Sequence, residues 1–265
     1  MEHALIEELT TTAIEAAAVA AEVQRAGWAT GFRVNAKGDH GDSVTDIDIA
    51  AEAAIRQCLK IARPDDSLIG EESDAPSELA RICWIVDPID GTANYLRRSD
   101  DFAVSIGVAV DGKHIVGVVQ QTATGRIWVG SPEECARDGE PIRVAQRSNL
   151  ADSIWATGFT TDPHDRERQL RFFSHLMTSV RDARRTGSPA LDLAHVADGT
   201  VDGYVEFGLG HWDYAAGAAL VAAAGGVVDI IDVAPWKGPL VIAAGTQFLV
   251  DEMRNVLRRA QVPNV

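Results

Sequence analysis

Two aspartates stand close together directly after a strongly apolar run. Asp87 and Asp90 belong to the segment Asp87-Pro88-Ile89-Asp90-Gly91-Thr92, which follows the apolar residues 82–86. An apolar run that meets Asp-Pro predicts a buried strand ending at a turn, and the Gly-Thr pair is typical of a helix start or a tight turn. Carboxylates in such a place can hold divalent cations, and free backbone N–H groups can bind an anion. The segment therefore indicates the chemistry of phosphate ester hydrolysis.

Three further acidic segments could meet this one in the fold. Glu71 and Glu72 follow the apolar residues 68–69, so they also stand at a strand end. Asp213 stands where a helix of small residues begins, and a helix N-terminus favours a carboxylate. The third is the polar segment 37–48. Hard cations such as Mg²⁺ bind carboxylate and carbonyl oxygens and commonly bridge phosphate oxygens, so we expect a magnesium site where the segments meet.

The overall charge limits the class of partner. The formal net charge is −15, from 24 basic and 39 acidic residues among 265. Such a charge argues against nucleic acid as the main partner. It also opposes the approach of an anionic substrate, so a phosphate site must be made positive locally. Bound metal ions are the simplest way to do that, and the expected partner is a small phosphorylated metabolite.

Cysteine usage and hydropathy predict a cytoplasmic protein. The three cysteines are far apart and show no metal-ligand spacing, which favours a reducing compartment without a disulfide framework. No signal peptide is visible after Met1. The longest apolar stretch, 214–228, contains three glycines and is too short to span a membrane. We therefore expect a soluble protein with no membrane partner.

The predicted elements change character halfway along the chain. Asp111-Gly112 is the clearest hairpin turn. Helical patterns cover 4–26, with Gly27 as the stop, and a stretch that opens at Thr45 and runs to residue 60; later helices are expected at 164–180, 190–197, 213–224 and up to residue 260. Strand-like runs are found at 67–70, 82–87, 102–110, 115–120, 126–129, 153–157, 203–207, 227–229 and 240–243. Helices against an antiparallel sheet followed by α/β alternation predict one domain, 1–265, with subdomains of approximately 1–145 and 146–265.

Four motifs together carry a family resemblance. They are Asp87-Pro88-Ile89-Asp90-Gly91-Thr92-Ala93-Asn94-Tyr95, Gly70-Glu71-Glu72-Ser73, Trp212-Asp213-Tyr214-Ala215-Ala216-Gly217 and Gly187-Ser188-Pro189-Ala190-Leu191-Asp192-Leu193. In these the chain resembles the inositol monophosphatase family, within the Mg²⁺-dependent, lithium-sensitive phosphatases that include fructose-1,6-bisphosphatase. The resemblance implies a layered αβαβα sandwich of mixed α+β and α/β character, a homodimer, and hydrolysis of a phosphomonoester, most simply inositol 1-phosphate.

The resemblance also assigns roles to residues. Two or three Mg²⁺ ions would be held by oxygens of Glu71, Asp87, the Ile89 carbonyl, Asp90 and Asp213. The water that attacks phosphorus would be activated by the Thr92 hydroxyl with Asp48, beside the metal that Glu71 holds. Backbone N–H groups of Gly91 and Thr92 would bind the phosphate. Substrate contacts would come from Glu206, Gly187 and Ser188, and Lys37 matches the mobile loop of the family.

Simpler interpretations stand beside several of these roles. Thr45 with Asp48 has the form of a helix capping box, a role that can coexist with catalysis. Glu206 could be a solvated carboxylate at a strand end, and a solvated charge is the default for Lys37. Asp213 could act as a helix cap only.

Two departures from the family leave the substrate open. Segment 96–101 lacks the Gly and Pro that usually follow Asn-Tyr, and Pro189 stands where many members carry a small Ala. The rival substrates are histidinol phosphate, 3′-phosphoadenosine 5′-phosphate and fructose bisphosphate. A non-catalytic interaction protein on the same fold is the alternative from another class, although every expected metal ligand is present here.

Overall fold

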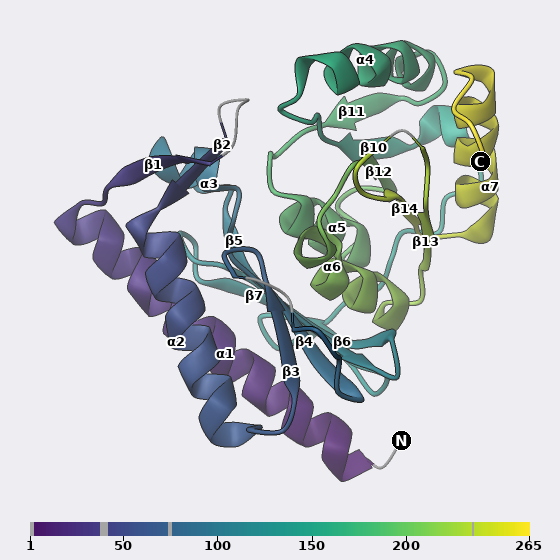
Figure 1. The fold of residues 1–265 in the computed structure, drawn as a ribbon. Helices are drawn as coiled ribbons and strands as arrows, with labels where there is room; N and C mark the ends of the chain where they lie inside the picture. Colours follow the sequence, from purple (N-terminus) through teal and green to yellow (C-terminus); the bar gives the residue numbers. More distant parts are fainter. Residues whose placement is uncertain (1–2, 38–41, 74–75, 235) are drawn as a thin grey trace.

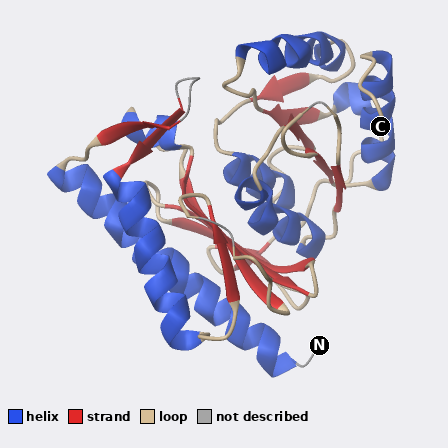
Figure 2. Ribbon diagram, viewed as in Figure 1, coloured by secondary structure: helices blue, strands red, loops and turns tan. Residues whose placement is uncertain are grey.

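The chain folds into alternating layers of helices and sheets. The structure, a computed structural model, describes residues 3–37, 42–73, 76–234 and 236–265. A seven-stranded and a five-stranded sheet face each other across α5 and α6, with further helices on the outer face of each sheet (Figures 1 and 2). This order of layers is the predicted αβαβα sandwich. The helices are α1 His3–Thr30, α2 Asp46–Ala62, α3 Thr92–Leu96, α4 Pro163–Met177, α5 Pro189–Ala197, α6 His211–Ala223 and α7 Gln247–Arg259, with a 3₁₀ turn, η1, at Leu150–Asp152.

The first sheet has the order β3-β4-β5-β6-β7-β8-β9. Its strands are β3 Ser67–Gly70, β4 Ile82–Asp90, β5 Ala103–Val110, β6 Lys113–Gln121, β7 Arg126–Gly130, β8 Cys135–Arg137 and β9 Glu140–Pro141. β3 runs parallel to β4, and the remaining neighbours are antiparallel. Every residue of β4 and β5 is buried, because α1 and α2 cover one face of the sheet and α6 covers the other. A strand covered on both faces reads as a continuous apolar run, which is how the sequence showed β4.

The second sheet is mixed and has the order β11-β10-β12-β14-β13. Its strands are β10 Ile154–Thr157, β11 Asp182–Arg184, β12 Gly203–Phe207, β13 Val227–Ile231 and β14 Leu240–Ala244. β10 is parallel to both β11 and β12, whereas β14 is antiparallel to β12 and β13. The sheets use residues 67–141 and 154–244, so the subdomain boundary that we predict at about 145 falls between them and stays a prediction.

Small residues allow α6 to fit between the two sheets. A Cβ added to Gly117 on β6 would lie 2.1 Å from the carbonyl oxygen of Ala216, and one on Gly107 of β5 would lie 2.8 Å from the Cβ of Ala215. On the other side, a Cβ on Gly217 would meet Leu193 of α5 at 2.4 Å. The small residues of α6 therefore follow from close packing on two sides, and this packing fixes where the first turn of α6 lies.

Two predicted boundaries are wrong for a packing reason. Gly27 does not end the first helix, which continues to Thr30; its missing side chain instead leaves room for Tyr95 and Ile47, whose atoms would lie 2.5 and 2.7 Å from an added Cβ. β4 does not end at Asp87 but continues through Pro88 to Asp90. Its register shifts between Asp87 and Asp90, and such an irregularity is where a strand accommodates proline.

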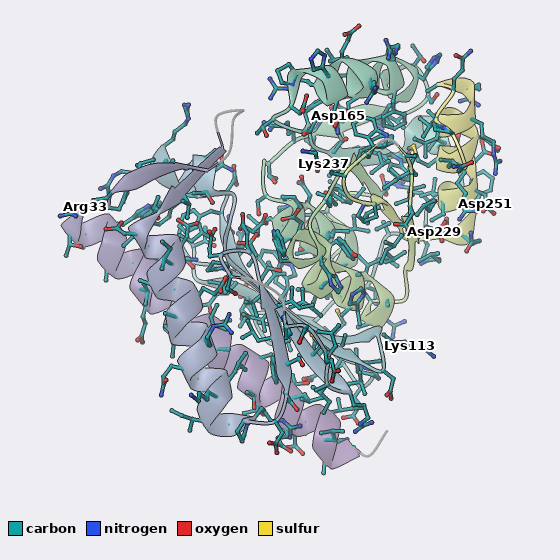
Figure 3. The ribbon with its side chains drawn as sticks, in the orientation of Figure 1. Arg33, Lys113, Asp165, Asp229, Lys237 and Asp251 are labelled. Carbon is teal, nitrogen blue, oxygen red and sulfur yellow. The ribbon has the colours of Figure 1, made fainter. Side chains whose placement is uncertain are left out.

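The hairpin at Asp111-Gly112 is confirmed, with φ of 50° and 74° at these residues. Positive φ at both positions belongs to the primed turns that match strand twist. Lys113 follows the turn at the periphery of the molecule (Figure 3). The sequence patterns did not predict the two-stranded ribbon of β1 Val34–Lys37 and β2 Asp42–Thr45 or the short strands β8, β9 and β11, which have too few residues to show a periodicity.

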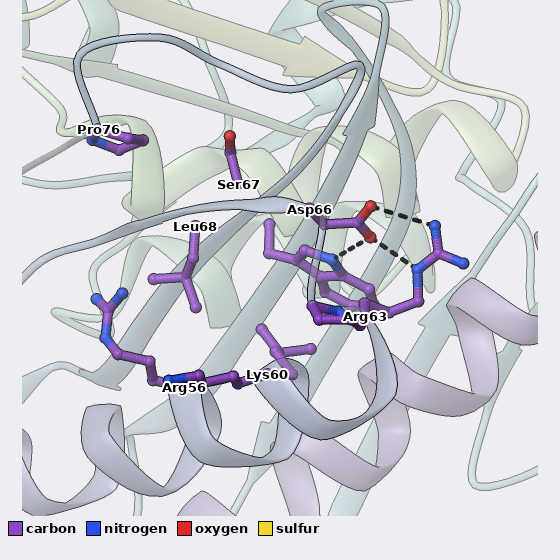
Figure 4. A pocket seen from close by; sticks show the side chains of 10 residues that line it. Arg56, Lys60, Arg63, Asp66, Ser67, Leu68 and Pro76 are labelled. Atoms are coloured by element: carbon purple, nitrogen blue, oxygen red, sulfur yellow. Dashed lines mark hydrogen bonds and ion pairs between the residues drawn. The ribbon is translucent and has the colours of Figure 1, made fainter.

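The turn from α2 to β3 is fastened by a partly buried carboxylate, whose side chain is 9% exposed. Asp66 accepts hydrogen bonds from Arg63 Nε at 2.8 Å and from the indole Nε1 of Trp84 at 3.0 Å (Figure 4). A cavity of about 460 Å³ lies beside this turn, and α2 supplies Arg56 and Lys60 to its wall (Figure 4). None of the aspartates of the predicted site lines this cavity, so we regard the arrangement as part of the scaffold.

Candidate active site

Three aspartates from two distant parts of the sequence meet between the two sheets. One carboxylate oxygen each from Asp87, Asp90 and Asp213 lies within 4.8 Å of the others. Asp87 and Asp90 are on β4 and are buried, whereas Asp213 is half-buried in the first turn of α6. The convergence expected for these segments is therefore present. Such a group of hard oxygen atoms has the composition of a site for Mg²⁺.

The irregular end of β4 sets the direction of the first two carboxylates. Asp87 Oδ1 accepts a hydrogen bond from the N–H of Ile89 at 2.9 Å. The Pro88 carbonyl, between them, accepts one from Gln24 Nε2 on α1 at 2.6 Å. This segment therefore departs from the regular ladder. On a regular strand, residues three positions apart, such as Asp87 and Asp90, would point to opposite faces of the sheet. The shift in register places both carboxylates at one site.

The N-terminal turns of two helices hold the other carboxylates. Asp90 Oδ2 accepts hydrogen bonds from the hydroxyl of Ser188 and, at 2.8 Å, from the N–H of Ala190, both at the start of α5. Asp213 Oδ2 accepts one from the N–H of Gly210 at 2.6 Å. Asp213 is thus a helix cap, as the simpler interpretation proposed, and a member of the cluster as well. Helix N-termini favour negative charge, and in both carboxylates these bonds are made to Oδ2.

The cluster carries negative charge without a basic partner. Among the described residues, no Lys, Arg or His lies within ion-pair distance of Asp87, Asp90 or Asp213. Burial raises the pKa of Asp87 and of Asp213 well above the usual range, and neighbouring carboxylates raise both further. Burial also raises the pKa of Asp90 to about 7, against the opposing effect of its bond from Ser188. Buried carboxylates are usually paired or coordinate a metal, so the donor set fits a divalent cation.

Thr92 and Asp48 lie beside the cluster, on α3 and α2. Thr92 Oγ1 is 3.2 Å from Asp48 Oδ1 and 3.0 Å from the Ile89 carbonyl oxygen. Asp48 Oδ2 accepts bonds from the backbone and the hydroxyl of Thr45, which completes a capping box. Burial raises the pKa of Asp48. The capping interpretation is confirmed, and the second oxygen of the same carboxylate faces Thr92.

Gly91 makes the turn between β4 and α3 with φ of +90°. Its carbonyl accepts hydrogen bonds from the N–H groups of Asn94 and Tyr95, so the N–H groups at the start of α3 have no partner within the helix. A Cβ on Gly91 would lie 3.0 Å from the carbonyl oxygen of Asp101 and 3.3 Å from that of Gly187. Glycine is required here for its conformation and for the close approach of two other loops.

Glu71 follows β3 and is half-buried. Its charge is the first electrostatic contribution, after burial, to the raised pKa of Asp87. Glu52 of α2 holds this turn, since its Oε2 accepts the N–H of Glu72 at 2.8 Å. Sequence reasoning missed Glu52. Its helical spacing of four residues from Asp48 on the buried face of α2 was the available signal.

Lys37 ends β1 and pairs with Asp42 of β2. The side chain of Lys37 and the loop 38–41 lie outside the described residues. The structure therefore does not place Lys37 in or away from the site.

Glu206 is buried on β12 and accepts a hydrogen bond from the hydroxyl of Tyr204 at 2.8 Å. It is not the solvated strand-end acid of the simpler interpretation. Burial raises its pKa to about 7, while the charge of Arg185 acts in the opposite direction. A Cβ on Gly158 would lie 2.2 Å from this carboxylate. Glycine there leaves the space that Glu206 occupies.

Gly187 and Ser188 lie in the turn before α5. Gly187 has φ of +86°, and Ser188 caps α5 while its hydroxyl holds Asp90. The family resemblance placed both residues near the substrate and did not show this link to Asp90, a predicted metal ligand. It also missed the side chain of Asn94, which bonds the carbonyl groups of Asp101 and Thr186. Its place two residues after Asp87-Pro88-Ile89-Asp90-Gly91-Thr92, within the longer motif that ends at Tyr95, was the available signal.

A five-layer sandwich with a carboxylate cluster between its sheets defines the class of layered, metal-binding phosphatase folds. A family model described as "Inositol monophosphatase family" matches residues 5–252, and the chain belongs to this family. It is 36% identical over 247 residues to an inositol-1-monophosphatase SuhB of Mycobacterium tuberculosis, covering 89% of this chain and 85% of that protein. It is 38% identical over 226 residues to a Nus factor SuhB of Salmonella typhimurium, covering 83% and 84%.

Solved structures agree with this assignment. The extragenic suppressor protein suhB of Bartonella henselae superposes with a TM-score of 0.85 at 30% identity, covering 95% of this chain and 98% of that one. The inositol monophosphatase of Anabaena gives a TM-score of 0.81 at 32% identity and 98% coverage of both chains. The predicted family and fold are thus confirmed. Family membership supports phosphatase activity, and in the described residues no helix is long and apolar enough to cross a bilayer.

Proposed function

We propose that this protein is a Mg²⁺-dependent phosphomonoester hydrolase whose principal substrate is inositol 1-phosphate. The observation that carries the proposal is the cluster of Asp87, Asp90 and Asp213, in which one oxygen of each carboxylate lies within 4.8 Å of the others. Among the described side chains, none that is basic forms an ion pair with these three. Thr92, Asp48 and the positive-φ turn at Gly91 lie beside the cluster. Together they supply ligands for cations, a polar pair for a water molecule and N–H groups for a phosphate.

The proposal assigns oxygen donors to two cations. Glu71, Asp87 and the Ile89 carbonyl would hold the first Mg²⁺, and Asp87, Asp90 and Asp213 would hold the second. A weaker third ion near Glu71 is part of the proposal. Bound Mg²⁺ supplies Lewis acidity, a more acidic water and charge stabilisation for the leaving oxygen.

The remaining residues orient and bind. Thr92, fixed between Asp48 and the Ile89 carbonyl, orients the attacking water and passes its proton towards Asp48, whose raised pKa suits it to accept one. The N–H groups of Gly91 and Thr92 bind phosphate oxygens in line with the attack. Glu206, aligned by Tyr204, accepts hydrogen bonds from hydroxyl groups of the leaving alcohol.

The choice of inositol 1-phosphate rests on the relatives that are named for it and on Glu206 as a buried acceptor. Pro189 and segment 96–101 differ from the usual family pattern and border this region. The competing substrates are histidinol phosphate, fructose bisphosphate and 3′-phosphoadenosine 5′-phosphate. Segments 93–101 and 187–192, with the surroundings of Glu206, would decide among them.

Release of inorganic phosphate from these four substrates, with Mg²⁺ or with a chelator, tests the proposal. We expect hydrolysis only with Mg²⁺, with the highest kcat/KM for inositol 1-phosphate. The comparison must be made by kcat/KM because discrimination between substrates is a ratio of these values. Hydrolysis unchanged by the chelator would refute the metal assignment, and a higher kcat/KM for another substrate would replace inositol 1-phosphate.

A second candidate function is a non-catalytic interaction with the transcription machinery. It is favoured by the relatives named Nus factor SuhB, at 38% identity. The acidic cluster separates the two functions, since an interaction protein has no need of unpaired buried carboxylates. An Asp213→Asn variant that keeps partner binding and loses hydrolysis would show that the two functions use different surfaces.

On the basis of the family resemblance, we also propose that the protein is a homodimer, that it is cytoplasmic and that lithium inhibits it. Light scattering after size exclusion tests the first, and fractionation of cells tests the second. For the third, we expect inhibition at roughly millimolar lithium, because a small monovalent cation can compete at a site built for a small divalent one. Hydrolysis insensitive to lithium would indicate a differently built metal site.

A further inference from the structure

Asn94 joins two loops that approach the carboxylate cluster from different parts of the fold. Its Nδ2 donates to the carbonyl oxygen of Asp101 at 2.6 Å and to that of Thr186 at 2.9 Å. Asp101 lies between α3 and β5, next to the first sheet, whereas Thr186 lies between β11 and α5, next to the second. A side-chain amide has two N–H donors. Asn94 therefore uses both N–H donors of its amide to link the two halves of the site.

A short path of hydrogen bonds leads from Thr186 to a proposed metal ligand. Thr186 Oγ1 accepts the N–H of Ser188 and donates to its carbonyl oxygen, both at 3.1 Å. The hydroxyl of Ser188 then donates to Asp90, which also accepts the N–H of Ala190. The turn that Asn94 holds is thus the turn that fixes the Asp90 carboxylate.

The backbone of Asn94 reaches the proposed phosphate site as well. Its N–H donates to the carbonyl oxygen of Gly91 at 2.8 Å. The three loops are in close contact here, because a Cβ on Gly91 would lie 3.3 Å from Ser188 Cβ and one on Gly187 would lie 3.3 Å from Asn94 Nδ2. A displacement of the Thr186 turn would therefore move Asp90 relative to the Gly91 turn.

We propose that Asn94 is a positioning residue that sets cation affinity through Thr186 and Ser188. It holds the turn before α5 against the turn before α3, and so keeps the Asp90 carboxylate in the geometry that binds the cation. The inference rests on the metal-dependent hydrolysis proposed above. Loss of the amide leaves two carbonyl groups without their donor, which is unfavourable, and it removes this link between the two loops.

Gln121 provides a matched control. Its Nε2 donates to the carbonyl oxygen of Asp100 at 3.0 Å, so it fastens the same loop as Asn94. In the described chain it makes no hydrogen bond to residues 186–188. A Gln121→Ala variant therefore loosens loop 97–101 and removes the acceptor of the Thr124 hydroxyl. Asn94→Ala, by contrast, also releases the turn that holds Asp90.

The test is Mg²⁺ affinity measured by calorimetry, together with the Mg²⁺ concentration that gives half-maximal phosphate release. We expect Asn94→Ala to bind Mg²⁺ about tenfold more weakly, the size of effect known for residues that orient metal ligands. Gln121→Ala should stay within about twofold of the unmodified protein, as sites that do not interact do. Equal Mg²⁺ affinities in the two variants would overturn the inference.

Thr186→Val tests the same path from the other side if Asn94→Ala fails to fold. It removes the hydroxyl and keeps the carbonyl that Asn94 binds. We expect weaker Mg²⁺ binding again, and a double variant with Asn94→Ala no weaker than the poorer single variant, because both act on one path. Fully additive losses would contradict the path. If the unmodified protein neither binds Mg²⁺ nor releases phosphate, the proposed function is wrong. If it does both, and Asn94→Ala and Thr186→Val bind Mg²⁺ as tightly as it does, only the proposed role of Asn94 is wrong.

Discussion

Buried carboxylates occur in this molecule in two settings. At Asp66, Asp198 and Asp202 each carboxylate meets an arginine at 2.8–3.2 Å. Asp66 and Asp198 also accept the indole N–H of a tryptophan, Trp84 and Trp128 respectively, at 3.0 Å. At the candidate active site, Asp87, Asp90 and Asp213 face one another instead. In the described residues their hydrogen bonds are with backbone N–H groups, with Ser188 and with the neighbouring acid Glu71.

The difference separates carboxylates that support the fold from carboxylates for which we propose a ligand. A carboxylate paired with arginine has its charge compensated within the chain. Three carboxylates that share one space repel one another, and burial disfavours their charge further. Such a cluster lowers the stability of the ligand-free fold, and the cation that we propose for this site would offset that cost. The two settings therefore predict opposite responses to substitution.

Asp213→Asn should have the largest effect on activity. The amide keeps an oxygen for the N–H of Gly210 and removes the charge directed at the cluster. Several kcal/mol of charge stabilisation depend on a bound metal, so we expect phosphate release to fall about a thousandfold or more. Asp198→Asn, in the other setting, should keep activity within about twofold, because it lies outside the cluster. A folded Asp213→Asn protein with full activity would remove the distinction between the settings.

The second-largest effect that we expect is on the pH dependence of stability, to which the carboxylates of the cluster should contribute. The folded pKa of Asp90 is raised to about 7, and those of Asp87 and Asp213 are raised as well. Between the ordinary carboxyl pKa, about 4, and pH 7, the folded state therefore binds more protons than the unfolded state. The free energy of unfolding that these groups contribute is highest at or below about pH 4 and falls as the pH rises towards 7.

Thermal unfolding in a chelator between pH 5 and pH 8 measures this dependence. We expect the melting temperature of the metal-free protein to fall across this range, and Mg²⁺ to raise it more at pH 8 than at pH 5, since a cation binds the ionised carboxylates. At one hundred times its Kd, Mg²⁺ stabilises by about 2.7 kcal/mol. Asp213→Asn should have a flatter dependence. A melting temperature that rises with pH equally with and without Mg²⁺ would count against an uncompensated cluster.

Asp198→Ala should lower stability and leave the chemistry unchanged. Its carboxylate is 1% exposed and accepts hydrogen bonds from Trp128 Nε1, Arg137 and the N–H of Thr200. Without it the indole N–H is buried with no acceptor, which costs about 2 kcal/mol. Asp198→Asn retains one acceptor oxygen, which can serve Trp128 Nε1. It loses the ion pair with a guanidinium that is 41% exposed and, at its second position, the acceptor for the N–H of Thr200. Because Thr200 is exposed and water can solvate its N–H, we expect a smaller loss, of about 1 kcal/mol. Denaturant unfolding with kcat/KM checks both variants, and equal losses in stability would mean that the ion pair dominates.

The same contrast explains which parts of the site the sequence could predict. Asp87, Asp90 and the Gly91-Thr92 turn stand in one short segment with a buried strand before it, so local patterning predicts them. Asp213 is more than one hundred residues away, and its approach depends on the fit of α6 against Gly107 and Gly117. No periodicity shows that fit. The family resemblance predicted the convergence, because it carries information on tertiary contacts that a single sequence does not display.

Other features follow from contacts that have no local signature. The strand β4 passes Pro88 because a shift in register accommodates it, although Asp-Pro ordinarily indicates a stop. Gly27 lies within α1 because Tyr95 and Ile47 need its space. The bond from Ser188 to Asp90 spans 98 residues. In each case tertiary packing decides the outcome, and the local preference gives way to it.

Glu167→Gln should have the smallest effect, because it removes a charge in neither buried setting. Glu167 and Arg171 form an ion pair of 3.6 Å on α4, with side chains that are 75% and 65% exposed. Water solvates both groups well, so the pair contributes at most about 0.5 kcal/mol and salt screens it. We expect the free energy of unfolding and the phosphatase activity to match those of the unmodified protein within error, in low and high salt. A loss in the free energy of unfolding as large as that of Asp198→Ala would contradict this expectation. Solvent exposure would then not distinguish the acids that support the fold from those that are only solvated.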